Sequence, residues 1–216
     1  SKTMDYTILP KTWRGYGRFR HFCDETPCAI TMQGRVDVTA LYHAVHGRLS
    51  FTGAMLYCAA YIINNRDEFR MTATREGEPA VWDESHPAYT IFHEDDETCT
   101  ATYTRYTADP AAFIRRYEED AARAQSIHTA GIPMPPNTFY ATVLPWYAYD
   151  AVGLQYGAGT EIPLAPAIVY GRFRRTTDGI ELPVTLSIHH AAADGYQVSR
   201  FFLDLGKVTT GVAKRL

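Results

Sequence analysis

Apolar and polar residues alternate, or form short apolar runs, along much of this chain, and the pattern predicts many strands with a few helices. An apolar run at 180–188 is typical of a buried strand and leads directly into His189 and His190. Three alanines and an Asp-Gly pair follow, and a helix-like run begins at Tyr196. A histidine pair is therefore expected at the end of a buried strand, where the small alanines leave room beside the imidazole rings.

The remaining elements are predicted from β-branched and aromatic runs, from apolar periodicity and from capping residues. Further strands are expected at 6–9, 28–32, 69–73, 80–83, 89–93, 98–103, 138–149 and 165–174, with helices at 37–45, at 50–63 and from Asp109 onward. The basic, aromatic segment 13–22 is expected to be a loop with stacked arginine–aromatic pairs. The order of elements predicts an α/β fold (an α+β two-layer sandwich), with a large mixed β-sheet covered by helices, in a single domain of residues 1–216.

Composition and charge narrow the classes of function. The chain has 216 residues, is 46% hydrophobic and carries a formal net charge of −3, so we expect a full core and no nucleic-acid or membrane partner. No stretch is long and apolar enough to span a bilayer. The four cysteines, Cys23, Cys28, Cys58 and Cys99, form no CxxC pair. We therefore expect no metal, reduced thiols and a cytoplasmic location.

The histidine pair is the leading candidate for chemistry. Because adjacent side chains on a strand point to opposite faces, only one of His189 and His190 can face a given cleft. From the residues alone, two hydrogen-bonded structural histidines are the alternative interpretation, and the position at a strand end together with the nearby Asp194 favours a site. A metal site lacks an obvious third ligand nearby, and a Ser-His-Asp hydrolase lacks a GxSxG motif.

The run from His189 to Gly195 resembles the HHxxxDG motif of the CoA-dependent acyltransferase superfamily. Further segments resemble landmarks of the chloramphenicol acetyltransferase family in that family's order: 67–71, 81–83, 86–87, 89–94, 144–146 and 196–200. The resemblance extends from about Tyr6 to Leu205. It implies a CoA-dependent O-acetyltransferase that uses acetyl-CoA as co-substrate, needs no metal, acetylates a hydroxyl of chloramphenicol and confers antibiotic resistance.

The resemblance also implies roles for individual residues. His190 matches the general base, which takes the proton from the attacking hydroxyl. Thr142 stands at the family's oxyanion-stabilising serine position, and it keeps the hydroxyl donor while adding a methyl group. His189 is expected to be a packed structural residue.

Asp194 matches an aspartate that pairs with an N-terminal arginine and holds the histidine loop in place. Counting from Trp13, the family's arginine position falls on Gly15. Arg14 is the expected substitute, with Arg18 as the alternative.

The acceptor pocket and the assembly follow from the same resemblance. Substrate-binding positions are expected at Phe22, Cys99, Tyr140, Val152, Leu154 and Val169. Several of these differ from the family pattern, notably Cys99 and Val169, and each is equally credible as a core residue. The family implies a homotrimer with active sites between subunits.

Three other functions stay open from the sequence. The first is an acetyltransferase of the same fold with a different hydroxyl acceptor, and the second is a dihydrolipoamide-type acyltransferase core. The third is a binding protein that sequesters a small aromatic ligand without turnover.

Overall fold

The computed structural model describes residues 5–129 and 131–216. Within them, the α-helices are α1 (Tyr16–Arg20), α2 (Thr39–Val45), α3 (Phe51–Asn64), α4 (Pro110–Gln125) and α5 (Gly195–Ala213). A π-helical turn covers His21–Glu25, and a 3₁₀ turn covers Asp67–Arg70. The strands are β1 (Tyr6–Ile8), β2 (Ala29–Asp37), β3 (Met71–Ala73), β4 (Pro79–Trp82), β5 (His86–His93), β6 (Thr98–Tyr103), β7 (Thr138–Val143), β8 (Ala167–Tyr170), β9 (Arg174–Arg175) and β10 (Ile180–His189).

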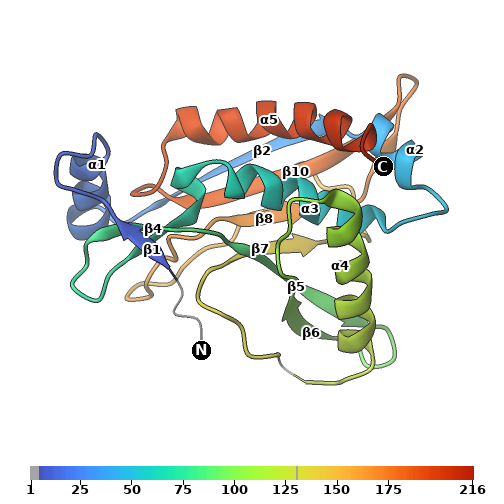
Figure 1. The fold of residues 1–216 in the computed structure, drawn as a ribbon, viewed down its shortest axis with the longest axis horizontal. Helices are drawn as coiled ribbons and strands as arrows, with labels where there is room; N and C mark the ends of the chain where they lie inside the picture. Colours follow the sequence, from blue (N-terminus) through green and yellow to red (C-terminus); the bar gives the residue numbers. More distant parts are fainter. Residues whose placement is uncertain (1–4, 130) are drawn as a thin grey trace.

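A seven-stranded mixed sheet forms the centre of the molecule. Its order is β2-β10-β8-β7-β5-β6, with β9 paired to β10. The β5–β7 and β7–β8 pairs are parallel, and the other pairs of this sheet are antiparallel. A smaller sheet of order β1-β4-β3 contains the predicted hairpin. The predicted fold class, a large mixed sheet with helices, is confirmed (Figure 1).

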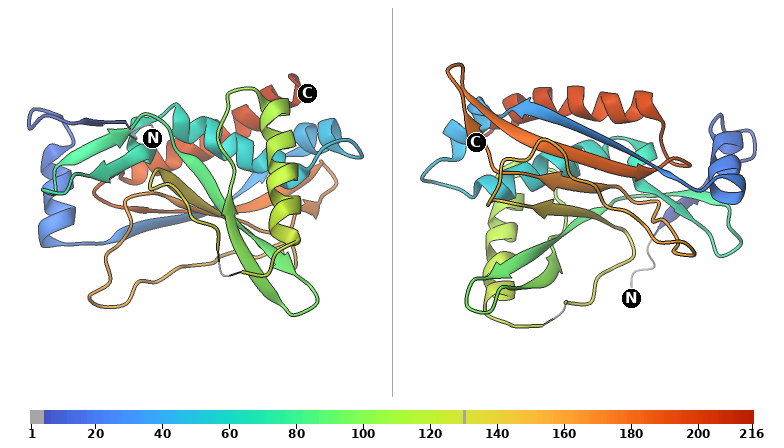
Figure 2. Two further views of the ribbon diagram at one scale, coloured as in Figure 1. Left: turned by 60° about the horizontal axis from the view of Figure 1, so that its bottom comes forward. Right: turned by 180° about the vertical axis from the view of Figure 1, so that it is seen from behind.

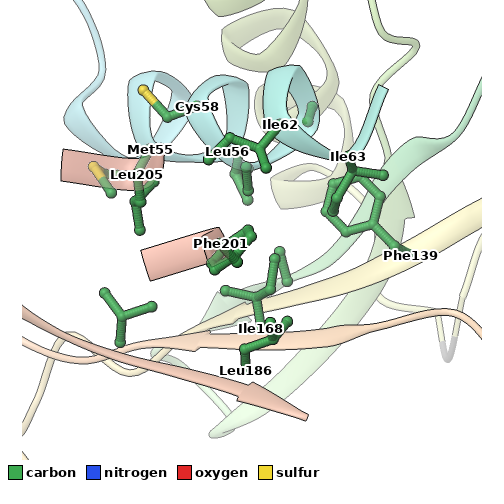
Figure 3. Close-up of a cluster of buried hydrophobic side chains, with 14 of the residues drawn as sticks. Met55, Leu56, Cys58, Ile62, Ile63, Phe139, Ile168, Leu186, Phe201 and Leu205 are labelled. Carbon is green, nitrogen blue, oxygen red and sulfur yellow. The ribbon is translucent and has the colours of Figure 1, made fainter. Parts of the chain in front are cut away.

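Helices α2, α3 and α5 lie along one side of the large sheet, and α4 stands beside β5 and β6 (Figures 1 and 2). Helix α3 is apolar around most of its circumference because it packs against α4 and α5 as well as the sheet. Ser50 caps this helix as predicted, since its Oγ accepts the Gly53 N–H at 3.0 Å. Figure 3 shows the resulting core, with side chains of α3 facing Phe201 and Leu205 of α5 and Ile168 and Leu186 of the sheet.

Strand β10 positions the histidine pair. It lies between β2 and β8, and its alternate residues Leu182, Val184, Leu186 and Ile188 belong to the core. The residues between them, which include Thr185 and Ser187, face the opposite side of the sheet. A strand buried on both faces carries His189 at its end.

The prediction of a loop at 13–22 is wrong, because helix α1 and the π-helical turn occupy most of it. Phe19 is completely buried here, so tertiary packing stabilises a helix that local preference does not favour. The expected arginine–aromatic pairs are present, with the Arg18 guanidinium 6.0 Å from the Trp13 ring and that of Arg20 5.0 Å from the Phe19 ring.

Candidate active site

The loop that carries the histidine pair is held by backbone hydrogen bonds. The His190 N–H donates to the Cys28 carbonyl at 2.9 Å, and the Ala192 N–H donates to the His189 carbonyl at 3.0 Å. Ala191, Ala192 and Ala193 are completely buried. The alanines are therefore packing residues that let the loop sit close to the core, and the space beside the histidine pair is a cavity of about 700 Å³ that His189 lines together with Arg20 and Cys23.

His190, the predicted base, is half-buried at the end of β10. Its ring stacks on the Phe22 ring, with centroids 3.8 Å apart and planes 7° from parallel. Its Nδ1 is buried and has no hydrogen-bond partner among the described residues. The stack fixes the plane of the imidazole and leaves Nε2 as the ring nitrogen available for proton transfer.

His189 is 5% exposed, so it is the packed member of the pair. Its Nδ1 accepts the Ala191 N–H at 3.0 Å, which places the ring proton on Nε2. Burial lowers the pKa of His189, and the neighbouring His190 lowers it further. His189 is therefore held neutral, and it fixes the backbone of the loop that carries His190.

Asp194 joins this loop to helix α5 and to the N-terminal segment. Its Oδ1 accepts the Tyr196 N–H at 3.0 Å, and Asp194 is the N-cap of α5 in a capping box with Gln197. Its Oδ2 lies 3.7 Å from Nη1 of Arg18, whose Nη2 also donates to the Ala192 carbonyl at 3.1 Å. Arg18 thus contacts both the aspartate and the histidine loop.

The prediction that Arg14 pairs with Asp194 is wrong. Arg14 is exposed in the turn before α1, whereas the helix directs Arg18 toward the loop. Gly15 cannot carry the family's arginine here, because a Cβ at this position would lie 2.3 Å from the Trp13 ring. Counting positions from Trp13 without gaps therefore missed Arg18, which α1 directs toward the histidine loop.

A cavity of about 450 Å³ lies on the face of the sheet opposite the helices. Five of the predicted site residues line it: Thr142, Tyr140, Val152, Leu154 and Val169. Thr142 and Val169 are direct partners on β7 and β8. The cavity is mainly apolar and has hydroxyl groups on its sheet wall, an arrangement suited to a small ligand of mixed polarity.

Three of the predicted catalytic and substrate-binding residues lie outside this cavity in the single chain. His190 and Phe22 stack on each other at the end of β10, and Cys99 is exposed on β6, opposite Phe92. One chain therefore does not bring His190, the predicted base, to the cavity that contains Thr142.

A second cavity, of about 670 Å³, was missed by sequence reasoning. It lies at the start of α3 and is lined by Phe51, Trp146, Arg172 and Phe173, among others. Val143 and Tyr170 face this cavity, whereas their neighbours Thr142 and Val169 face the first one. The two cavities therefore lie on opposite faces of the same ends of β7 and β8. The alternation of side-chain direction along these strands is the sequence signal that could have indicated the second cavity.

Comparison with known proteins decides the family. A family model described as chloramphenicol acetyltransferase matches residues 4–206. The chain belongs to the chloramphenicol acetyltransferase family. Acyl transfer is therefore its reaction class.

The curated relatives of this family member agree with the assignment. A chloramphenicol acetyltransferase of Clostridium perfringens is 33% identical over 200 residues, covering 92% of this chain and 95% of the relative. Another, of Streptomyces acrimycini, is 34% identical over 199 residues, covering 90% of this chain and 89% of the relative. A third, of Vibrio anguillarum, is 31% identical over 210 residues, covering 95% of this chain and 94% of the relative.

Solved structures support the fold. A chloramphenicol acetyltransferase matches with a TM-score of 0.76 at 16% identity, covering 94% of this chain and 99% of that one. A dihydrolipoamide acetyltransferase of Azotobacter vinelandii matches with a TM-score of 0.66, also at 16% identity, covering 93% of this chain and 88% of that one. Among the described residues of this acetyltransferase family member, no helix combines the length and apolar character needed to cross a membrane.

Proposed function

We propose that this protein transfers the acetyl group of acetyl-CoA to a hydroxyl of chloramphenicol and so confers resistance to the antibiotic. The observation that carries the proposal is the cavity of about 450 Å³, because five residues predicted from the family resemblance converge on it. The curated relatives described above are all named chloramphenicol acetyltransferases.

In this proposal, His190 is the general base. Its Nε2 takes the proton of the acceptor hydroxyl as the oxygen attacks the thioester carbonyl, and it returns a proton to the departing thiolate. The stack on Phe22 keeps the ring plane fixed during both transfers. Arg18 and Asp194 hold the loop and take no part in proton transfer.

Thr142 supplies the donor for the tetrahedral intermediate. Its hydroxyl lies in the cavity wall beside the proposed acceptor positions. A positioned donor is effective here because negative charge develops on the former carbonyl oxygen only during the reaction.

The second cavity is the proposed entry of acetyl-CoA. It offers three aromatic rings, from Phe51, Trp146 and Phe173, together with the cation of Arg172. These groups suit a ligand that combines an adenine ring with phosphates. Because this cavity lies across β7 and β8 from the Thr142 cavity, donor and acceptor would approach the reaction centre from opposite sides of the sheet.

A homotrimer with active sites between subunits is part of the proposal. In one chain, His190 does not line the Thr142 cavity, so a complete site requires His190 from a neighbouring copy. Tyr140 is 51% exposed and Leu154 is 59% exposed at this cavity, which leaves apolar surface for a second chain to cover. We also propose that residues 1–216 form one domain, since one hydrophobic cluster extends from Phe19 to Val212.

A cytoplasmic location completes the proposal. The four cysteines are free thiols, in keeping with a reducing compartment.

The alternative acceptor hypothesis has two specific observations in its favour. Cys99, at a position where the family commonly has phenylalanine, is exposed and outside the cavity, and Val169 replaces a hydroxyl residue. An acceptor panel of hydroxylated antibiotics and aromatic alcohols distinguishes it from chloramphenicol transfer. If the protein is a dihydrolipoamide-type core, size-exclusion chromatography should show a large cubic assembly. If it is a sequestering protein, it should bind the ligand without turnover.

The proposal is tested by release of CoA thiol from acetyl-CoA in the presence of chloramphenicol. We expect turnover by the wild type and a loss of about 10²- to 10⁴-fold in His190→Ala. His43→Ala, which alters an exposed histidine on α2, is the matched control and should keep full activity. Absence of thiol release with chloramphenicol in the wild type would remove the acceptor from the proposal.

A further inference from the structure

A group of metal-binding side chains lies at the outer end of the β5–β6 hairpin. His93 ends β5, Asp95 lies in the following turn, and His128 follows the end of α4. One donor atom from each of these residues lies within 4.8 Å of the others. The two histidines are far apart in the sequence, so only the fold brings these three donors together.

His93 is completely buried, and its hydrogen bonds define its tautomer. The Thr100 hydroxyl donates to the Ile127 carbonyl at 3.0 Å, so it accepts the Nε2–H of His93 at 2.8 Å. Nδ1 of His93 therefore carries the lone pair, and it accepts the Gln125 side-chain amide at 3.2 Å. A buried imidazole with a fixed ring and an unprotonated nitrogen is prepared to bind a metal.

His128 is oriented by two carboxylates. Its Nδ1 lies 3.0 Å from Oδ2 of Asp96, and its Nε2 lies 3.7 Å from Oδ2 of Asp95. A carboxylate that accepts one ring N–H and so presents the other nitrogen to an ion is the usual outer partner of a metal-bound histidine. Asp96 fits that outer role, and Asp95 fits the role of a ligand.

We propose that His93 Nδ1, His128 Nε2 and the Asp95 carboxylate bind one divalent transition-metal ion of the zinc type, with water at the fourth position. Two imidazoles and a carboxylate form a donor set that Zn²⁺ accepts in tetrahedral geometry. No cysteine takes part in this site, so the absence of a CxxC pair, from which we expected no metal, does not bear on it.

Binding requires a limited rearrangement. The two imidazole rings stack with centroids 3.9 Å apart and planes 25° from parallel, so their lone pairs do not yet meet at one point. The side chains of His128 and Asp95 are 43% and 72% exposed, so both can turn without disturbing the core. The ion also replaces the hydrogen bond between Gln125 and His93.

The bound ion would join the segment that follows α4 to the β5–β6 hairpin. In the part of the chain that the structure describes, the three ligands line neither the cavity that contains Thr142 nor the cavity that contains Phe51. The site therefore acts as a structural link and is separate from the proposed acetyl transfer.

The test is calorimetric titration of ZnCl₂ into metal-free, full-length protein. We expect one ion per chain in the wild type and in His43→Ala, and loss of this event in His128→Ala and in Asp95→Asn. Asp96→Asn should weaken binding about 10-fold, because it removes the negative charge of the outer partner and leaves the three ligands in place. All these positions are exposed, so circular dichroism should show unchanged folding and should separate loss of binding from loss of structure.

A second measurement excludes the thiols as the source of binding. With Co²⁺ as the probe, we expect ligand-field bands without thiolate charge transfer, and the same spectrum in Cys99→Ser. The proposal is overturned if the wild type binds no Zn²⁺ at micromolar concentration, if His128→Ala binds as tightly as His43→Ala, or if Cys99→Ser loses the event.

Discussion

Thr142 offers a test of the proposed site at the scale of a single hydroxyl. Replacing it with the isosteric valine removes the donor while the shape of the cavity wall is preserved. We expect Thr142→Val to lower kcat about 10²- to 10³-fold with little change in KM for chloramphenicol, because the hydroxyl acts on charge that develops in the transition state. The rate of CoA thiol release measures this effect.

Thr142→Ser is the matched control for this substitution. It keeps the hydroxyl and should retain activity near the wild-type level. Both variants should unfold at the wild-type denaturant concentration, since Thr142 is only half-buried and lines a cavity. A valine variant with wild-type kcat would show that another donor stabilises the oxyanion.

Arg18 and Arg14 provide a second comparison between single residues. Arg18→Ala removes the contacts with Asp194 and with the Ala192 carbonyl, so we expect a stability loss of about 1–2 kcal/mol. We also expect kcat to fall about 10-fold or more, because the His190 loop loses its anchor. Arg14→Ala should change neither quantity, and equal effects of the two variants would contradict the assignment of Arg18.

The glycines of the helices give a prediction at the scale of elements. A Cβ on Gly53 in α3 would lie 2.7 Å from the Tyr117 ring of α4. Gly53→Ala should therefore destabilise the protein by about 1–3 kcal/mol, although alanine favours a helix more than glycine does. Gly206 in α5 has nothing within 4 Å of such a Cβ, so Gly206→Ala should stabilise by about 0.5–1 kcal/mol. Urea unfolding of the two variants measures both effects, and the same sign for both would contradict the packing argument.

The elements also show what a sequence can predict. Helix α3 and strand β10 were predicted nearly to their ends, because a serine cap and a continuous apolar run are local signals. Helix α1 was not predicted, because it is stabilised by the burial of Phe19 against distant parts of the chain and not by a local sequence signal. The same omission led to Arg14 in place of Arg18, since the direction of that side chain depends on the helix.

The site follows the same rule. The HHxxxDG motif and the wider family resemblance proposed His190, Asp194 and Thr142 as site residues without a structure. The cavity behind Phe51 and the pairing of His93 with His128 come from segments that meet only in the folded chain. Contacts of this kind leave no short-range pattern in the sequence.

At the scale of the whole molecule, the proposed trimer predicts a mass near three times 24.3 kDa in solution. Leu154→Asp places a charge on the apolar surface beside the Thr142 cavity. We expect it to dissociate the assembly and abolish acetyl transfer while helix content is retained. Leu203→Asp, on the exposed face of α5, is the control and should leave the mass unchanged, as measured by light scattering. A wild-type monomer with full activity would refute the trimer.

Subunit mixing tests whether His190 and Thr142 of one site come from different chains. His190→Ala and Thr142→Val are each expected to be nearly inactive as pure assemblies. If one chain supplies the base and its neighbour supplies the hydroxyl, refolding the two together in equal amounts creates interfaces that pair an intact His190 with an intact Thr142. Random assortment then restores about one quarter of the wild-type thiol release. If both residues act within one chain, no interface in the mixture is complete and the mixture stays as inactive as its components.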